Sequence, residues 1–129
     1  MQDGAPAPEA TQGPAHLTSE YVSALSNAVA TGDKAAVRRL AGDLKAPDLA
    51  DLLELLSADD RVGVIEMLGT GFDPEVLSEV DEGVRDQLGE DLPNEILAEA
   101  VAKLDTDDAA YVLESLEEAD KQEVLSQIS

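Results

Sequence analysis

Carboxylate side chains are the groups in this chain whose type and spacing could do chemistry. They bunch where helices are expected to begin, at Asp59–Asp60, Asp73 and Glu75, Asp81–Glu82, Asp105 with Asp107–Asp108, and Glu117–Glu118 with Asp120. Carboxylate oxygens are the ligands that Mg²⁺ and Ca²⁺ prefer, and Mg²⁺ keeps several waters, so one or two carboxylates can suffice. Acids repeated at one phase of a regular array would form a negative ridge, which favours sparse, shared cation sites.

A structural explanation of the same acids stays open beside the metal hypothesis. A carboxylate in the first turn of a helix accepts unpaired backbone N–H groups and complements the helix dipole, and contributes about 0.3–1 kcal/mol. No calcium loop of the EF-hand type is present. The segment that begins at Asp105 lacks the glycine at loop position six and the acid at position twelve. A dedicated, high-affinity calcium site is therefore not expected.

The net charge of the chain limits the classes of partner that it can bind. There are 29 acids against 8 bases, a net charge of −21. Residues 47–129 hold 24 of these acids against four bases, which places −20 on that part of the chain. Nucleic acid is not expected as a partner, because its recognition needs basic surface and aromatic side chains for stacking. The acidity favours metal cations or a basic protein surface instead.

Catalytic groups are missing from the sequence. The chain has no cysteine, and its one histidine, His16, lies in a Pro/Ala/Gly-rich segment. No Gly-rich phosphate loop and no His/Glu metal motif occurs. Paired-carboxylate hydrolysis needs two acids in an enclosed cleft, whereas these acids are expected on the surface. We expect neither an enzyme nor a small-molecule substrate.

A twelve-residue repeat must position these acids. Apolar residues recur at intervals of twelve. A second apolar residue lies four positions before each of them, and in most repeats a third lies three positions before it. Such a triplet covers one face of an α-helix, and helices this short must bury that face against their neighbours. The final positions of the repeat are Leu44, Leu56, Leu68, Val80, Leu92, Leu104, Leu116 and Ile128, and Gly89 is the one break in the preceding positions. The pattern predicts a stacked helical array.

Capping and breaking residues divide the array into about nine short helices with no strand. Residues 1–17 are rich in proline, alanine and glycine, and we expect them to be a disordered tail before an ordered domain of residues 18–129. The expected helices span residues 19–31, 34–44, 47–56, 58–68, 74–80, 82–88, 93–104, 106–116 and 119–128.

Several segments, in this order and spacing, resemble the cytoplasmic N domain of the MgtE family of magnesium channels and transporters. They are AVATGDKAAVRRL at 28–40, APDLADLLELL at 46–56, EVLSEV at 75–80 and LDTDDAAYVL at 104–113. The resemblance extends over residues 19–128. It implies a right-handed superhelix of short helices that precedes a pair of CBS domains and a membrane pore domain, both absent from this chain.

The resemblance also implies a mechanism. In the family, Mg²⁺ bridges acids of the N domain to acids of the CBS domains, and the compact arrangement closes the pore. The full-length protein is then a homodimer in the membrane, with this domain on its cytoplasmic face and the CBS domains as partners. Such a ligand-biased element responds to the Mg²⁺ concentration.

Carried over by position, the bridging acids fall on Glu75 and Asp107. The family commonly has a further acid where this chain has Tyr111, so that contact is expected either to be missing or to be supplied by Asp108. Tyr111 itself is expected to be a partly buried packing residue. With the partner half of each site absent, Mg²⁺ should bind the isolated domain weakly.

An acidic helical-repeat scaffold that grips a basic partner without metal is the alternative. The middle domain of the flagellar motor switch protein has a related helical architecture, so the fold alone cannot separate the two functions. The Glu-His-Pro-Gln recognition motif of that family does not occur in this chain.

Overall fold

Residues 19–128 are described by the computed structural model, and within them the chain is helical with no strand. This confirms the all-α prediction. The expected tail at residues 1–17 lies outside the described residues. The elements are α1 (Ser19–Thr31), α2 (Lys34–Ala41), α3 (Ala46–Leu55), α4 (Ala58–Leu68), the 3₁₀ turn η2 (Gly69–Gly71), α5 (Val76–Glu79), α6 (Glu82–Asp91), α7 (Asn94–Lys103), α8 (Thr106–Glu114) and α9 (Glu118–Ile128).

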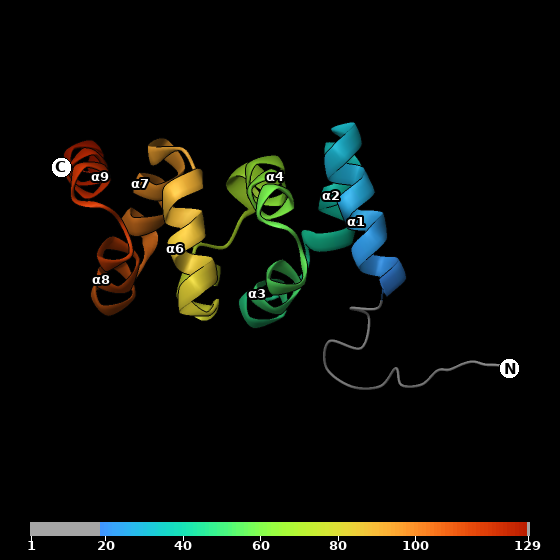
Figure 1. The fold of residues 1–129 in the computed structure, drawn as a ribbon, viewed down its shortest axis with the longest axis horizontal. Coiled ribbons are helices and arrows are strands. Elements are labelled where there is room, and N and C mark those ends of the chain that lie inside the picture. The colour runs from blue at the N-terminus through green and yellow to red at the C-terminus, as the bar shows by residue number, and fades with distance from the viewer. Residues whose placement is uncertain (1–18, 129) are drawn as a thin grey trace, which may run out of the picture.

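The helices lie side by side along the long axis of the molecule, with α1 and α9 at opposite ends (Figure 1). Four pairs of packed helices among the described residues are two repeats apart: α2 packs on α4, α3 on α5, α4 on α6, and α7 on α9. The other packed pairs have different spacings, since α1 packs on both α2 and α4, and α8 packs on both α5 and α7. The helix that follows Glu75 and the helix that carries Asp107 and Asp108 are therefore neighbours. The row agrees with a stacked array, and the right hand of its superhelix stays a prediction.

The apolar triplets of the repeat form the core. Leu52, Leu53, Val64, Val76 and Leu88 are fully shielded from solvent. At the final repeat position, Leu56, Leu68, Val80, Leu92 and Leu116 are buried. Leu44 and Leu104 are half-buried against the same core. Since burial of one such side chain is worth about 1.5–3 kcal/mol, the row of stripes supplies the main driving force for folding.

The repeat predicted burial wrongly at the end of the array. Leu125 and Ile128 keep 39% and 38% of their surface exposed, although their register places them on the apolar face. At the earlier repeats the residues in these positions are buried or half-buried. The helix α9 packs chiefly on α7 and ends the described row, so periodicity overestimates burial there.

Gly89, the break in the repeat, marks a close approach between α6 and the segment after α8. A Cβ built on Gly89 would lie 2.8 Å from Cδ2 of Leu116. The missing side chain therefore makes room for a core leucine from two repeats further along the chain.

Capping residues start the helices much as expected. Asp33 accepts from the N–H of Ala36 at 3.1 Å, and Ser57 from that of Asp60 at 3.3 Å. Most expected bounds lie within two residues of the observed ones, and two ends are wrong by three residues. The second helix ends at Ala41 rather than Leu44, and the helix of residues 82–88 continues to Asp91.

None of the helices among the described residues has both the length and the apolar character that a membrane crossing requires.

Candidate functional site

Glu75 lies at the N-cap of α5, on a backbone that its neighbours hold in place. Its N–H donates to Oδ1 of Asp73 at 3.0 Å, and its carbonyl accepts from the Ser78 hydroxyl at 2.9 Å. The residue is exposed, and within residues 19–128 its carboxylate takes part in no hydrogen bond or ion pair. The position of this acid is thus defined while its oxygens remain available.

Asp107 and Asp108 lie in the first turn of α8. Asp107 is exposed and Asp108 is half-buried. Neither carboxylate caps the helix, and Asp105, the N-cap residue, makes no side-chain cap hydrogen bond either. Because α5 packs on α8, the structure brings the segment of Glu75 beside the helix of Asp107 and Asp108.

Some acids at or near other helix starts do accept backbone N–H groups. Asp81 accepts from the N–H of Gly83 at 3.1 Å, and Asp73 accepts from that of Glu75. The Oε2 atom of Glu54 accepts from the N–H of Asp81 at 3.0 Å. Capping thus accounts for some of the acids, as the structural explanation proposed. Capping does not explain Glu75, Asp107 and Asp108, because their carboxylates accept no backbone N–H group.

The negative charge is hardly neutralised from within. Among the described residues one ion pair occurs, between Nζ of Lys121 and Oε1 of Glu118 at 3.7 Å. Arg61 and Arg85 donate instead to backbone carbonyl oxygens of Leu53 and Leu77, at 2.7 and 2.9 Å. The acidic half of the domain therefore presents most of its charge to solvent.

A complete metal cage is not present in the described part of the chain. No three His, Cys, Asp or Glu side chains of residues 19–128 come together in a way that could hold a metal ion. The assignment of Glu75, Asp107 and Asp108 as metal ligands accordingly stays a prediction.

Tyr111 corrects one expectation. It was expected to be partly buried, but 56% of it is exposed. Residue 111 lies four positions after Asp107 on the outer face of α8, where an aromatic side chain meets solvent rather than the core. The guanidinium carbon of Arg85 lies 5.4 Å from the centre of the Tyr111 ring. Shallow depressions flank the ring, one beside Asp107 and Glu114 and one beside Glu82 and Asp86.

Sequence reasoning missed Arg85. A signal for it was present, since Arg61 and Arg85 are 24 residues apart and each follows a core leucine, Leu53 or Leu77, by eight residues. The two arginines are two repeats apart, and several packed helix pairs of this array have the same spacing.

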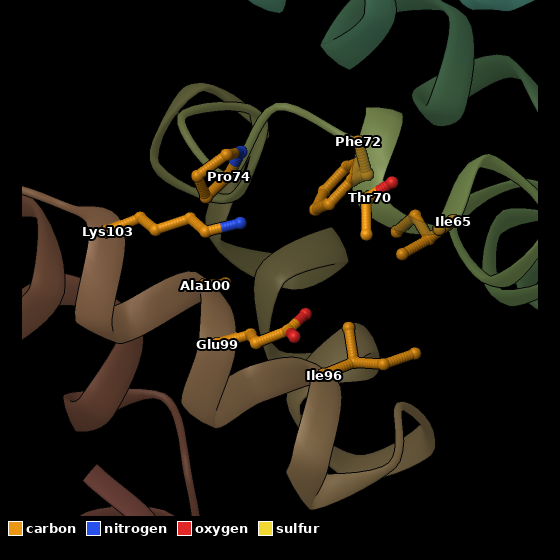
Figure 2. A pocket seen from close by; sticks show the side chains of 9 residues that line it. Ile65, Thr70, Phe72, Pro74, Ile96, Glu99, Ala100 and Lys103 are labelled. Carbon is orange, nitrogen blue, oxygen red and sulfur yellow. The ribbon is translucent and has the colours of Figure 1, made fainter.

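A separate apolar hollow of about 140 Å³ lies between η2, the start of α5 and α7. In Figure 2, Phe72 and Thr70 face Ile96 and Glu99 across it, and Lys103 reaches toward Pro74. None of the three predicted acids lines this hollow.

The fold and this surface define an acidic α-helical repeat domain whose uncapped carboxylates lie on neighbouring helices. A family model described as the MgtE intracellular N domain matches residues 44–129. Because the match covers two thirds of the chain, the chain belongs to the MgtE intracellular N domain family, a family of transporter domains rather than of enzymes. The match includes Glu75, Arg85, Asp107, Asp108 and Tyr111, and it begins after α2.

No curated protein and no solved structure matches the chain.

Proposed function

We propose that this chain is the regulatory, Mg²⁺-sensing domain of a magnesium transporter and acts at the cytoplasmic face of the membrane. Glu75 and Asp107, with Asp108, donate carboxylate oxygens to Mg²⁺ ions that are shared with acids of a following CBS domain pair. The observation that carries the proposal is the contrast among the acids. Asp73 and Asp81 accept backbone N–H groups, whereas the carboxylates of Glu75, Asp107 and Asp108 accept none. Glu75 is the N-cap residue of α5, and α5 packs on α8, the helix of Asp107 and Asp108.

Electrostatics explains how such a surface can sense a cation. Two acidic surfaces repel each other, and divalent ions that screen and bridge them favour the compact arrangement. The ion concentration then biases a two-state equilibrium by its differential affinity for the two arrangements. A compact arrangement that closes the pore at high Mg²⁺ makes this domain the regulatory element. The full-length transporter is expected to be a homodimer.

Shared sites also explain why residues 19–128 contain no complete metal cage. Mg²⁺ takes one or two protein carboxylates and retains several waters, so each partner needs to supply only part of the ligand set. Tyr111 offers a phenol, a poor ligand for Mg²⁺ at neutral pH, and the half-buried Asp108 lies three residues before it on the same helix. We therefore expect weak Mg²⁺ binding by the domain alone.

The test is Glu75→Gln, Asp107→Asn and Asp108→Asn in the protein that carries the following domains. Limited proteolysis over a Mg²⁺ titration reports compaction. Each substitution removes a charge at nearly constant shape, so the Mg²⁺ concentration that gives half-protection should rise.

Glu66→Gln is the matched control. Glu66 is an exposed acid of α4, and α4 is not one of the helices that pack on α5 or α8. It should leave the half-protection concentration unchanged. Unaltered protection in all three site variants would remove these residues from the site.

A further inference from the structure

Arg85 joins three elements around the predicted acids. From α6, its Nε donates to the carbonyl oxygen of Leu77 at 2.9 Å, and its Nη2 donates to that of Val80 at 3.0 Å and to that of Ser78 at 3.5 Å. These carbonyls belong to the C-terminal end of α5 and its C-cap. A guanidinium presents its donors as a rigid, planar fork, so one side chain can fix several acceptors at once.

The α5 helix depends on such external support. It comprises only Val76–Glu79, and no side-chain hydrogen bond caps its start. A helix of one turn has little stability of its own, and its last carbonyls have no partner within the helix. Arg85 supplies donors to those carbonyls and places a positive charge at the negative end of the helix dipole.

The other side of the Arg85 guanidinium meets α8. Its central carbon lies 5.4 Å from the centre of the Tyr111 ring, within the range of a cation–π interaction. Tyr111 follows Asp107 by one helical turn and Asp108 by three residues. The ring thus ties the helix that carries these two acids to the guanidinium that holds α5.

This arrangement leaves the carboxylates unpaired. Glu82 and Asp86 border the same depression as Arg85 and Tyr111, yet among the described residues neither forms an ion pair with Arg85 within 4.0 Å. Arg85 donates N–H groups to carbonyl oxygens, and its guanidinium carbon lies over the Tyr111 ring. The acids around it therefore keep their charge for an external cation.

Arg61 provides a comparison within the same molecule. It lies two repeats earlier, and its Nε donates to the carbonyl oxygen of Leu53 at 2.7 Å. Its Nη1 donates to the side-chain oxygen of Gln87 at 3.1 Å, and it stacks on no ring within the described residues. Both arginines support the end of a preceding helix, but only Arg85 links that helix to α8.

We propose that Arg85 is a positioning residue of the acidic surface and that Tyr111 is the second half of the same clamp. Together they hold α5, which follows Glu75, and α8, which bears Asp107 and Asp108, at a fixed spacing without neutralising any of the three acids. The proposed link to cation sensing rests on the function proposed above, whereas the clamp itself does not.

Amide hydrogen exchange of the metal-free full chain tests the clamp alone. Amides 76–80 are hydrogen-bonded, so each reports the opening of α5. Arg85→Lys and Tyr111→Leu should both accelerate the exchange of amides 76–80. For Tyr111→Leu the acceleration should be about two- to fivefold, because that factor corresponds to the loss of an exposed cation–π contact. Tyr111→Phe, which keeps the ring, should exchange like the original chain.

Arg61→Lys is the control, and it should accelerate exchange near Leu53 while leaving amides 76–80 unchanged. Tyr111 is exposed, so its leucine variant should fold even if Arg85→Lys does not. Tyr111 and α5 are more than 30 residues apart in sequence, so a merely local effect would not reach α5. Unchanged exchange of amides 76–80 in Tyr111→Leu would overturn the clamp.

A Mg²⁺ titration of the same variants, followed by protease protection in the protein with its following domains, tests the link to sensing. Arg85→Lys and Tyr111→Leu should raise the half-protection concentration about two- to fivefold, and Arg61→Lys should not. Protection that responds to Mg²⁺ in the original chain but does not shift in these variants would overturn the positioning role. If Mg²⁺ protects no version, the proposed function fails, and the exchange data still decide on the clamp.

Discussion

At the scale of single residues, the environment of each carboxylate matters more than its presence in a first turn. Asp81 and Asp73 accept backbone N–H groups, as the structural explanation of the acids requires. Glu75, Asp107 and Asp108 have the same sequence context but no such bond. The sequence could predict where the acids gather. It could not separate the two groups, because the distinction depends on side-chain rotamers and small shifts of the helix starts.

Alanine substitutions of Leu53 and Leu55, two leucines of α3, test the predicted core burial. Leu53 is fully buried, whereas Leu55 is 57% exposed. Leu53→Ala should lower the free energy of unfolding by about 2–5 kcal/mol, the range for a large core side chain that leaves a cavity. Leu55→Ala should change it by less than about 0.5 kcal/mol. Urea unfolding of both variants measures the difference, and equal losses would mean that the helical phase is wrong.

Tyr21 gives the domain a dependence on alkaline pH. Its hydroxyl donates to the carbonyl oxygen of Leu40 and so ties α1 to α2. Burial disfavours the phenolate and raises the pKa of Tyr21. With a folded pKa above the unfolded one, the folded state retains the proton longer. This contribution is complete below about pH 10 and is lost as the pH rises through the folded pKa.

Tyr21→Phe removes that titration. The variant should be less stable than the original chain by about 0.5–1.5 kcal/mol near neutral pH, for one lost hydrogen bond. The gap between the two should then narrow as the pH rises above about 10. Urea unfolding at a series of pH values measures this gap, and a gap that stays constant or widens would contradict the assignment.

At the scale of helices, local signals predicted the elements well and their ends less well. Proline, glycine and hydroxyl or acidic caps gave nine helices in the right order. The helix α2 ends early because the i to i−4 pattern stops at Gly42, whose N–H still donates to the carbonyl oxygen of Arg38 at 2.8 Å. The N–H of Leu44 then bonds in a tighter turn to the carbonyl oxygen of Ala41 at 3.2 Å. The helix α6 extends past Gly89 to Asp91, and its last turn is closed by the N–H of Leu92, which donates to the carbonyl oxygen of Leu88 at 2.9 Å.

Close packing between helices can be tested at Gly63 of α4. A Cβ there would lie 2.4 Å from Cγ1 of Val29 on α1, and valine is stiff about χ1. Alanine favours the helix by about 0.8–1 kcal/mol, but overpacking costs about 1–3 kcal/mol. Gly63→Ala should therefore lower the melting temperature.

Gly71→Ala is the control for that substitution, because nothing lies within 4 Å of a Cβ built on Gly71. It should leave the melting temperature nearly unchanged. A rise in the melting temperature of Gly63→Ala would show that α1 and α4 are further apart than described.

At the scale of the whole molecule, the repeat predicted a stacked array but not its pattern of contacts. Half of the packed helix pairs among the described residues are two repeats apart, whereas α1 packs on its direct neighbour α2 and α5 reaches as far as α8. Glu75, Asp107 and Asp108 were selected through the resemblance rather than through spacing. The Arg85–Tyr111 contact joins separate elements, so it could be recognised only once the helices were arranged in space.

The most direct measurement of the central claim compares the thermal unfolding of this chain in MgCl₂ and in NaCl at equal ionic strength. Plain screening of the acidic half stabilises the fold in both salts to the same degree. Bound Mg²⁺ adds a stabilisation that grows with its concentration relative to the dissociation constant. The account predicts a higher melting temperature in millimolar MgCl₂ and a smaller excess after Glu75→Gln with Asp107→Asn. Equal melting temperatures in the two salts would contradict it and favour an acidic scaffold without a metal role.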